Sequence, residues 1–149
     1  MQKLIILIIS FSMLFISTYL KANSEIKIAG KKVMKIRVII KNKALIATLY
    51  DNATTRGFIK KLPLNLPMRD LYDRELVYRF QNPLPADEVS YRGYQVGEII
   101  YYPPFHSFVI MYAQNGERFS MQSMGRINDN INWLKGIGDT NMRFELIIN

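Results

Sequence analysis

Residues 33–50 read VMKIRVIIKNKALIATLY, and this segment indicates β-structure. From Val33 to Ile40, apolar residues recur at every second position, the period typical of a strand with one buried face. Residues 41–43 predict a turn in which Asn42 adopts a positive φ. Ala44 to Tyr50 then predicts a second strand, so the segment as a whole predicts a β-hairpin.

One short helix is expected next, over about residues 52–62. Asn52 or Thr54 can accept a hydrogen bond from a free backbone N–H at its start, and Pro63 ends it. A helical turn is expected near residues 130–134, before two closely spaced glycines.

Short apolar or alternating segments predict strands along the rest of the chain. They are residues 64–68, 76–80, 99–102, 108–112, 119–127 and 142–148. Pro67 predicts that the first of them is an edge or irregular strand, because proline cannot donate to a ladder. Asn115-Gly116 predicts a hairpin turn, and residues 82–90, with two prolines, predict a loop.

Many short strands and one short helix predict a mainly β domain over residues 33–149. A sandwich and a barrel both fit this pattern. We expect a closed barrel of about eight strands, because closure leaves no exposed strand edge. A chain of 149 residues, 49% of them hydrophobic, suits one domain of this kind.

The N-terminus has the layout of a secretory signal peptide. Residues 1–3 form a short start made basic by Lys3, residues 4–20 are apolar, and Ala22 offers a small residue for cleavage. We therefore predict a signal peptide over residues 1–22, a flexible lead-in over 23–32, and export across the inner membrane to the periplasm or the medium. The alternative is an uncleaved membrane anchor formed by residues 4–20.

Composition excludes several kinds of chemistry. The chain has no cysteine and one histidine, so disulfides, thiolate catalysis and multi-histidine metal sites are ruled out. No motif predicts a cofactor or a metal. The net charge is +8, and residues 27–43 are basic without an acidic residue. Because aromatic residues are not interleaved with that basic run, we expect no nucleic-acid partner.

Several blocks of sequence together resemble bacterial and archaeal cyclophilin-like fold proteins. They are LYDNAT at residues 49–54, LPLNLPM at 62–68, DLYDRE at 70–75, GYQVGEIIYYPP at 93–104, FVIMY at 108–112 and MGRI at 124–127. Their order and spacing carry the resemblance, which spans residues 34–148. It implies a cyclophilin-like β-barrel. It implies no isomerase site, because the Phe-His-Arg and Gln-Gly-Gly-Asp strings of cyclophilin enzymes do not occur here.

Two functions remain open at this point. One is a binding module for a small ligand or an extended peptide; the other is a divergent peptidyl-prolyl isomerase acting on exported proteins. An isomerase needs an arginine aimed into an apolar groove, whereas a module needs only the groove. The candidate pocket residues are aromatic, sulfur-containing or basic: Arg79, Tyr101, Tyr102, Phe105, His106, Met121, Arg126 and Trp133.

Overall fold

Antiparallel strands make up most of residues 34–148, the part of the chain that the computed structural model describes. The elements are β1 (Met34–Ile40), β2 (Lys43–Leu49), α2 (Ala53–Ile59), β3 (Leu64–Leu71), β4 (Glu75–Arg79), β5 (Ser90–Gly93), β6 (Glu98–Tyr102), the 3-10 turn η1 (Pro103–Phe105), β7 (Ser107–Met111), β8 (Arg118–Ile127), the 3-10 turn η2 (Asn132–Leu134) and β9 (Thr140–Leu146).

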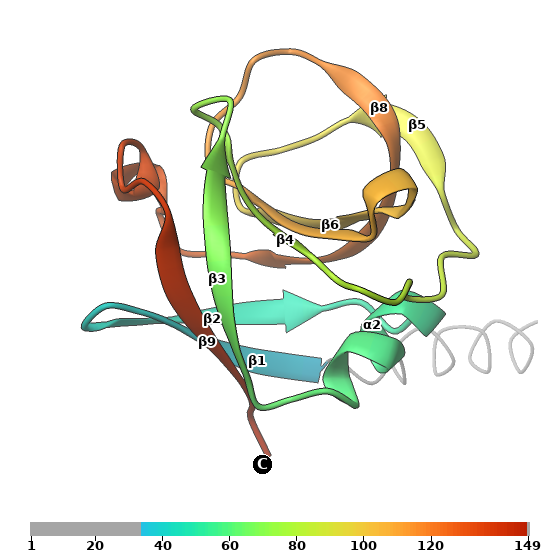
Figure 1. Cartoon of the computed structure of the whole chain (residues 1–149), viewed down its shortest axis with the longest axis horizontal. Helices are drawn as coiled ribbons and strands as arrows, with labels where there is room; N and C mark the ends of the chain where they lie inside the picture. The colour runs from blue at the N-terminus through green and yellow to red at the C-terminus, as the bar shows by residue number, and fades with distance from the viewer. Residues whose placement is uncertain (1–33, 149) are drawn as a thin grey trace, which may run out of the picture. The chain divides into compact units, whose positions relative to one another are not determined.

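The sheet closes on itself through eight of these strands. Its order is β2-β1-β9-β3-β4-β7-β6-β8, and β8 pairs back with β2 to complete the ring (Figure 1). The closing ladder joins residues 47–49 of β2 to residues 125–127 of β8. The expected fold class, a mainly β chain with a closed barrel of eight strands, one helix and short helical turns, is confirmed.

The β1–β2 hairpin behaves as its alternation predicts, with one correction. Ile36, Val38 and Ile40 are fully buried inside the barrel. Ile40 pairs with Lys43, so the loop is the two residues 41 and 42. Lys41, and not Asn42, has the positive φ, 54°. A two-residue hairpin loop needs the left-handed conformation at its first position, and this geometry overrides the preference of asparagine for it.

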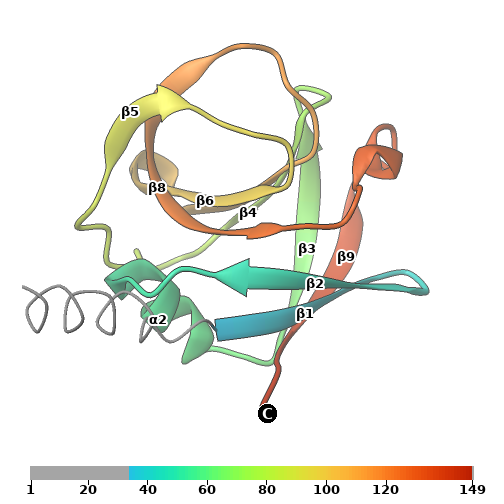
Figure 2. The same cartoon turned by 180° about the vertical axis from the view of Figure 1, so that it is seen from behind.

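The helix α2 lies at one end of the barrel, at the bottom of both views (Figures 1 and 2). The Asn52 side chain accepts a hydrogen bond of 2.9 Å from the Thr55 backbone N–H, which fixes the start of the helix. Phe58 stacks on Phe108 with 4.6 Å between ring centroids and meets Phe144 edge-on. The helix therefore adds an aromatic plug to the barrel core.

Three local expectations need correction. Residues 90–93 form β5, a ninth strand paired with β8, whereas the sequence predicted a loop up to residue 90 and no strand before residue 99. Asn115-Gly116 does not close a hairpin, because β7 and β8 are not neighbours in the sheet. The strand containing Pro67 is not at an edge of the ring. However, residues 64–68 pair only with β9 and residues 69–71 only with β4, so proline at 67 disrupts no second ladder.

The predicted signal peptide, membrane anchor and lead-in lie outside the described residues. The described residues 34–148 belong to one compact unit. Within residues 34–148, no helix combines the length and the apolar character needed to cross a membrane.

Candidate functional site

Strands β4, β6 and β7 carry apolar side chains on both faces. Leu76, Ile99 and Phe108 point into the barrel core. Alternate residues of these strands, Val77, Ile100, Val109 and Met111, form a second apolar cluster on the outside of the barrel wall together with Tyr94 and Met121. Because these come from the wall, from β8 and from the turn after β5, the first half of β8 with β5 folds over the outside of the barrel.

A groove of about 350 Å³ opens beside this second cluster. We call it the outer groove; its main lining residues are Val77, Arg79, Tyr102, Phe105, Val109 and Phe119. Val77 and Val109 are cross-strand partners on β4 and β7 and are almost fully buried. The groove thus has an apolar floor with aromatic side chains beside it.

A buried ion-pair group lies along the groove at Arg74. Its Nε donates to Glu75 at 3.1 Å, and its Nη1 pairs with Glu117. Burial opposes the charge of Arg74, but the hydrogen bond to Glu117 and the field of Glu75 raise the pKa of Arg74. Burial raises the pKa of Glu75, although the neighbouring Arg74 works against that rise. The carboxylates therefore neutralise Arg74.

Arg79 places a second guanidinium at the groove. Its Cζ lies 4.9 Å from the centroid of the Phe105 ring, a cation–π arrangement. Among residues 34–148 it has no ion pair with a carboxylate. The groove consequently combines an apolar floor with a positive charge that the described chain leaves unneutralised.

The structure brings together only some of the predicted pocket residues. Arg79, Tyr102 and Phe105 line the outer groove. His106 follows Phe105, adopts a φ of 48°, and donates its backbone N–H to Pro103.

The other predicted pocket residues lie elsewhere. Tyr101 is fully buried in the core inside the barrel, because strand alternation turns it away from the groove. Met121 is fully buried in the second apolar cluster and does not line the groove. The Tyr101 hydroxyl accepts a hydrogen bond from the Leu84 backbone N–H. Trp133 lies in a separate hollow, under the ammonium of Lys43 at 4.4 Å. Arg126 lies in the polar pocket described next.

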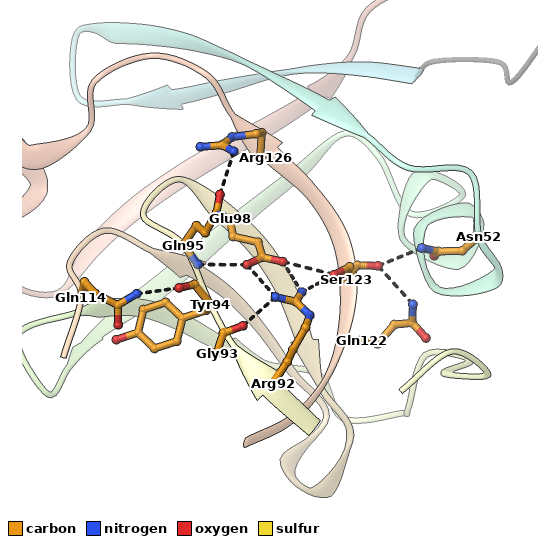
Figure 3. Close-up of polar contacts among 10 residues, drawn as sticks. All are labelled: Asn52, Arg92, Gly93, Tyr94, Gln95, Glu98, Gln114, Gln122, Ser123 and Arg126. Carbon is orange, nitrogen blue, oxygen red and sulfur yellow. Dashed lines mark hydrogen bonds and ion pairs between the residues drawn. The ribbon is translucent and has the colours of Figure 1, made fainter. Parts of the chain in front are cut away.

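A second hollow, of about 450 Å³, lies where β8 changes its pairing partner from β5 to β2. We call it the polar pocket; its polar lining includes Tyr50. Figure 3 shows five further lining residues, Arg92, Gln95, Glu98, Ser123 and Arg126. These side chains come from β5, β6 and β8, from the turn between β5 and β6, and from the residue that follows β2. The register of β6 against β8 shifts between Ile99 and Ile100, which marks an irregularity beside the pocket.

Glu98 is the centre of the hydrogen-bond network in this pocket. Its two oxygens accept from both terminal nitrogens of Arg92, and its Oε2 accepts from the Gln95 backbone N–H at 3.1 Å (Figure 3). The Ser123 hydroxyl lies 3.1 Å from Oε1. The hydrogen bond to Glu98 raises the pKa of Arg92 above its ordinary value. This fork-to-carboxylate arrangement is the strong, orienting form of an ion pair.

Sequence analysis missed Glu98, Ser123 and the second apolar cluster. Arg92 and Glu98 stand close together in the sequence on either side of Gly93 and Gly97, and this spacing was the available signal. Ser123 gave no signal, because its place in the network depends on the folding of β8 over the barrel. Three or more acidic or histidine side chains placed to hold a metal ion do not occur among the described residues.

Together, the closed eight-stranded barrel, its helical plug and the groove on its outer wall define a cyclophilin-like β-barrel domain. The match to the cyclophilin-like family covers residues 38–148, and the chain belongs to that family.

A solved structure supports the same fold. The solution structure of a hypothetical protein from Archaeoglobus fulgidus aligns with a TM-score of 0.62 at 20% sequence identity, over 79% of this chain and 99% of that one. At this identity the likeness establishes the fold alone. No curated protein matches the chain significantly.

Proposed function

We propose that the chain is an exported binding module whose outer groove holds a small ligand or an extended peptide. The single observation that carries the proposal is the groove itself, about 350 Å³ of space over the valine pair 77 and 109. Ligand sites in proteins are typically concave and largely apolar, with a few polar groups that orient the ligand. Arg79 and the Tyr102 hydroxyl would supply those groups.

Exposed aromatic side chains favour a peptide among the ligands. Tyr72 and Phe105, both of which line the groove, are 74% and 57% exposed. Large apolar rings left in solvent are frequent at recognition surfaces. An extended peptide would lay its side chains over the valine floor and contact these rings at its ends.

One observation keeps a second function open, a peptidyl-prolyl isomerase acting on exported proteins. Arg79 stands beside an apolar floor, which meets the requirement for an arginine next to a slot for the proline ring. An isomerase lowers the barrier to amide rotation by favouring the twisted amide, and a donor to the imide nitrogen serves that purpose.

A titration with labelled protein tests the binding function. A proline-containing peptide and a matched proline-free peptide are added while backbone amide shifts are recorded. We expect saturable shifts at the groove residues. In Arg79→Gln we expect affinity about three- to tenfold lower, because a charge-assisted hydrogen bond is lost. Arg56→Gln, which removes the same charge from α2, should bind as the natural chain does. Shifts that never saturate, or equal affinity in Arg79→Gln, contradict the proposal.

The same two peptides separate the two functions. Exchange spectroscopy measures the cis–trans rate of the proline peptide with and without the protein. Acceleration that disappears in Arg79→Gln supports the isomerase, whereas binding without acceleration supports the module.

Export is tested on the N-terminus of the protein as the cell makes it. Mass spectrometry of the full-length product from a bacterial host should give an N-terminus at Asn23, with the protein in the periplasm or the medium. A chain that keeps residues 4–20 and sediments with membranes supports the anchor instead.

A further inference from the structure

The charge of Arg126 in the polar pocket has no carboxylate partner among the described residues. Arg126 on β8 is the cross-strand partner of Glu98 on β6, so Glu98 is the carboxylate in register to form an ion pair with it. Both oxygens of Glu98 are instead taken by Arg92. Among residues 34–148, Arg126 forms no ion pair. The pocket therefore holds one carboxylate and two guanidinium groups, and its charge is positive.

Within residues 34–148, the guanidinium of Arg126 donates two hydrogen bonds. Nη1 donates to Gln95 Oε1 at 3.2 Å and Nη2 donates to the Val96 carbonyl at 3.3 Å. Both acceptors are neutral, and both distances are long for charged donors. A guanidinium offers five N–H donors, so further N–H groups of Arg126 remain for a ligand in the pocket.

The backbone beside Arg126 is held in one position. A methyl group built on Gly97 would lie 2.6 Å from the Ile127 carbonyl oxygen, so the turn that carries Gln95 and Val96 is pressed against β8. The Gly97 N–H and carbonyl both bond to neighbouring strands, to Met111 and Ile127. The Val96 carbonyl that accepts from Arg126 is thus held in place before any ligand arrives, which lowers the entropy lost on binding.

Tyr50 adds a second donor at the mouth of the pocket. It follows the last residue of β2, lines the pocket and is 43% exposed. No hydrogen bond of its hydroxyl occurs among the described residues. A phenol beside an arginine is a common pair of donors to a charged oxygen, because the phenol adds one directed O–H to the planar fork.

We propose that the polar pocket is a second binding site, which takes a small oxyanion on Arg126 and Tyr50. The planar fork of arginine matches the paired oxygens of a carboxylate or a phosphate. Glu98 does not repel such a ligand strongly, because Arg92 neutralises it. The polar pocket shares no lining residue with the outer groove, so a test of this second site is independent of a test of the proposed function.

Calorimetric titration of the full chain, backed by amide shifts, tests the site, with inorganic phosphate and acetate as separate probes. We expect saturable binding of one probe at millimolar concentration, with shifts in residues 92–98 and 123–126. Arg126→Gln should weaken binding at least about tenfold, since it removes a charged fork. Tyr50→Phe should weaken it about threefold, because only one neutral hydrogen bond is lost.

Two further variants make the test specific. Arg118→Gln removes an equal charge from the start of the same strand and should bind as the natural chain does. Arg126→Lys keeps the charge without the fork and should restore only part of the affinity. Saturation by phosphate assigns a phosphoryl group and saturation by acetate a carboxylate. Absence of saturation with both probes, or an equal loss in Arg118→Gln, overturns the proposal. If circular dichroism shows that Arg126→Gln is unfolded, Tyr50→Phe and Arg126→Lys replace it in the test. Weaker binding in both variants then supports the site, and unchanged binding in both overturns it.

Discussion

The carboxylate of Glu98 joins segments that lie apart in the sequence. It is 8% exposed and holds Arg92 of β5, the Gln95 backbone and Ser123 of β8 together (Figure 3). Among the strands of residues 34–148, β5 pairs with β8 alone, through a ladder of four residues. The Arg92–Glu98 pair adds a direct side-chain link from β5 to β6.

Replacing Glu98 with glutamine should weaken the fold measurably. The variant keeps the shape of the side chain but leaves the half-buried Arg92 charge without its carboxylate. We expect the free energy of unfolding in urea to fall by about 2 kcal/mol, less than for a fully buried pair because Arg92 retains contact with water. Glu145→Gln breaks exposed pairs with Arg37 and Arg143 and serves as the control. Equal stability of both variants would show that the Arg92 pair contributes no more than a surface ion pair.

Glu75 should give the stability of the protein a recognisable pH dependence. Burial raises its pKa above the ordinary value of 4.5, so the folded state binds this proton more tightly than the unfolded state does. Its contribution is fully present below the unfolded pKa and is lost as the pH rises through the folded pKa. Glutamine copies the protonated form at every pH. The stability of Glu75→Gln relative to the natural chain should therefore increase between pH 4 and pH 7, as urea unfolding at both values will show. A constant or declining difference contradicts the raised pKa.

At the scale of elements, β8 pairs with three other strands. Its first part pairs with β5, its middle and last parts with β6, and its last three residues also close the barrel against β2. Gly125 lies in the closing ladder opposite Leu49. A methyl group at this position would come within 2.3 Å of the Thr48 carbonyl oxygen and 2.8 Å of the Leu49 Cα. Only a glycine lets β2 and β8 approach closely enough to close the ring.

Gly125→Ala should therefore open or strain the closing ladder. Because the obstructing atoms belong to the backbone of β2, they cannot rotate away, and we expect a loss of about 3 kcal/mol in the free energy of unfolding. Gly136→Ala is the matched control. Its φ is +75°, but nothing lies within 4 Å of the added methyl, so only backbone strain of about 1 kcal/mol is expected. Hydrogen exchange should also quicken at residues 47–49 in Gly125→Ala alone; equal effects of the two substitutions would argue against steric closure.

Local sequence patterns predicted the positions of helices and strands better than they predicted which of these elements contact one another. The alternation in β1 and the cap at Asn52 depend on neighbouring residues, and both appear in the structure as expected. β5 was missed because four residues, with Ser90 and Tyr91 exposed, carry no period of two. The Asn115-Gly116 turn was assigned to a hairpin because turn chemistry does not reveal which strands become neighbours. For the same reason, sequence singled out Tyr101 with Tyr102, although adjacent residues of a strand face opposite sides of the barrel wall.

At the scale of the whole molecule, two apolar clusters share one wall. The core inside the ring and the cluster outside it meet across β4, β6 and β7, whose residues alternate between them. These three strands are consequently protected on both faces, as their buried patterns show. Each proposed site borders β5 or the first half of β8, the two elements that cover the outer cluster: Arg92 of β5 lines the polar pocket and Phe119 of β8 lines the outer groove. A ligand at either site would therefore contact one of these two elements as well as the wall of the ring.

Residues 33–149 should fold without the segment that precedes them. All the described strands lie between Met34 and Leu146, and the ring is completed by pairing within that range. A chain that begins at Val33 should show the same far-ultraviolet spectrum and the same urea midpoint as the chain that begins at Asn23, in one cooperative transition. A chain that begins at Val38 is the informative control, because it lacks the first half of β1 and with it the pairing of residues 34–37 to β2. It should lose most of its stability, since β1 stands between β2 and β9 in the ring. A lower midpoint for the chain that begins at Val33 would mean that residues 23–32 contribute to the fold and that the boundary lies earlier.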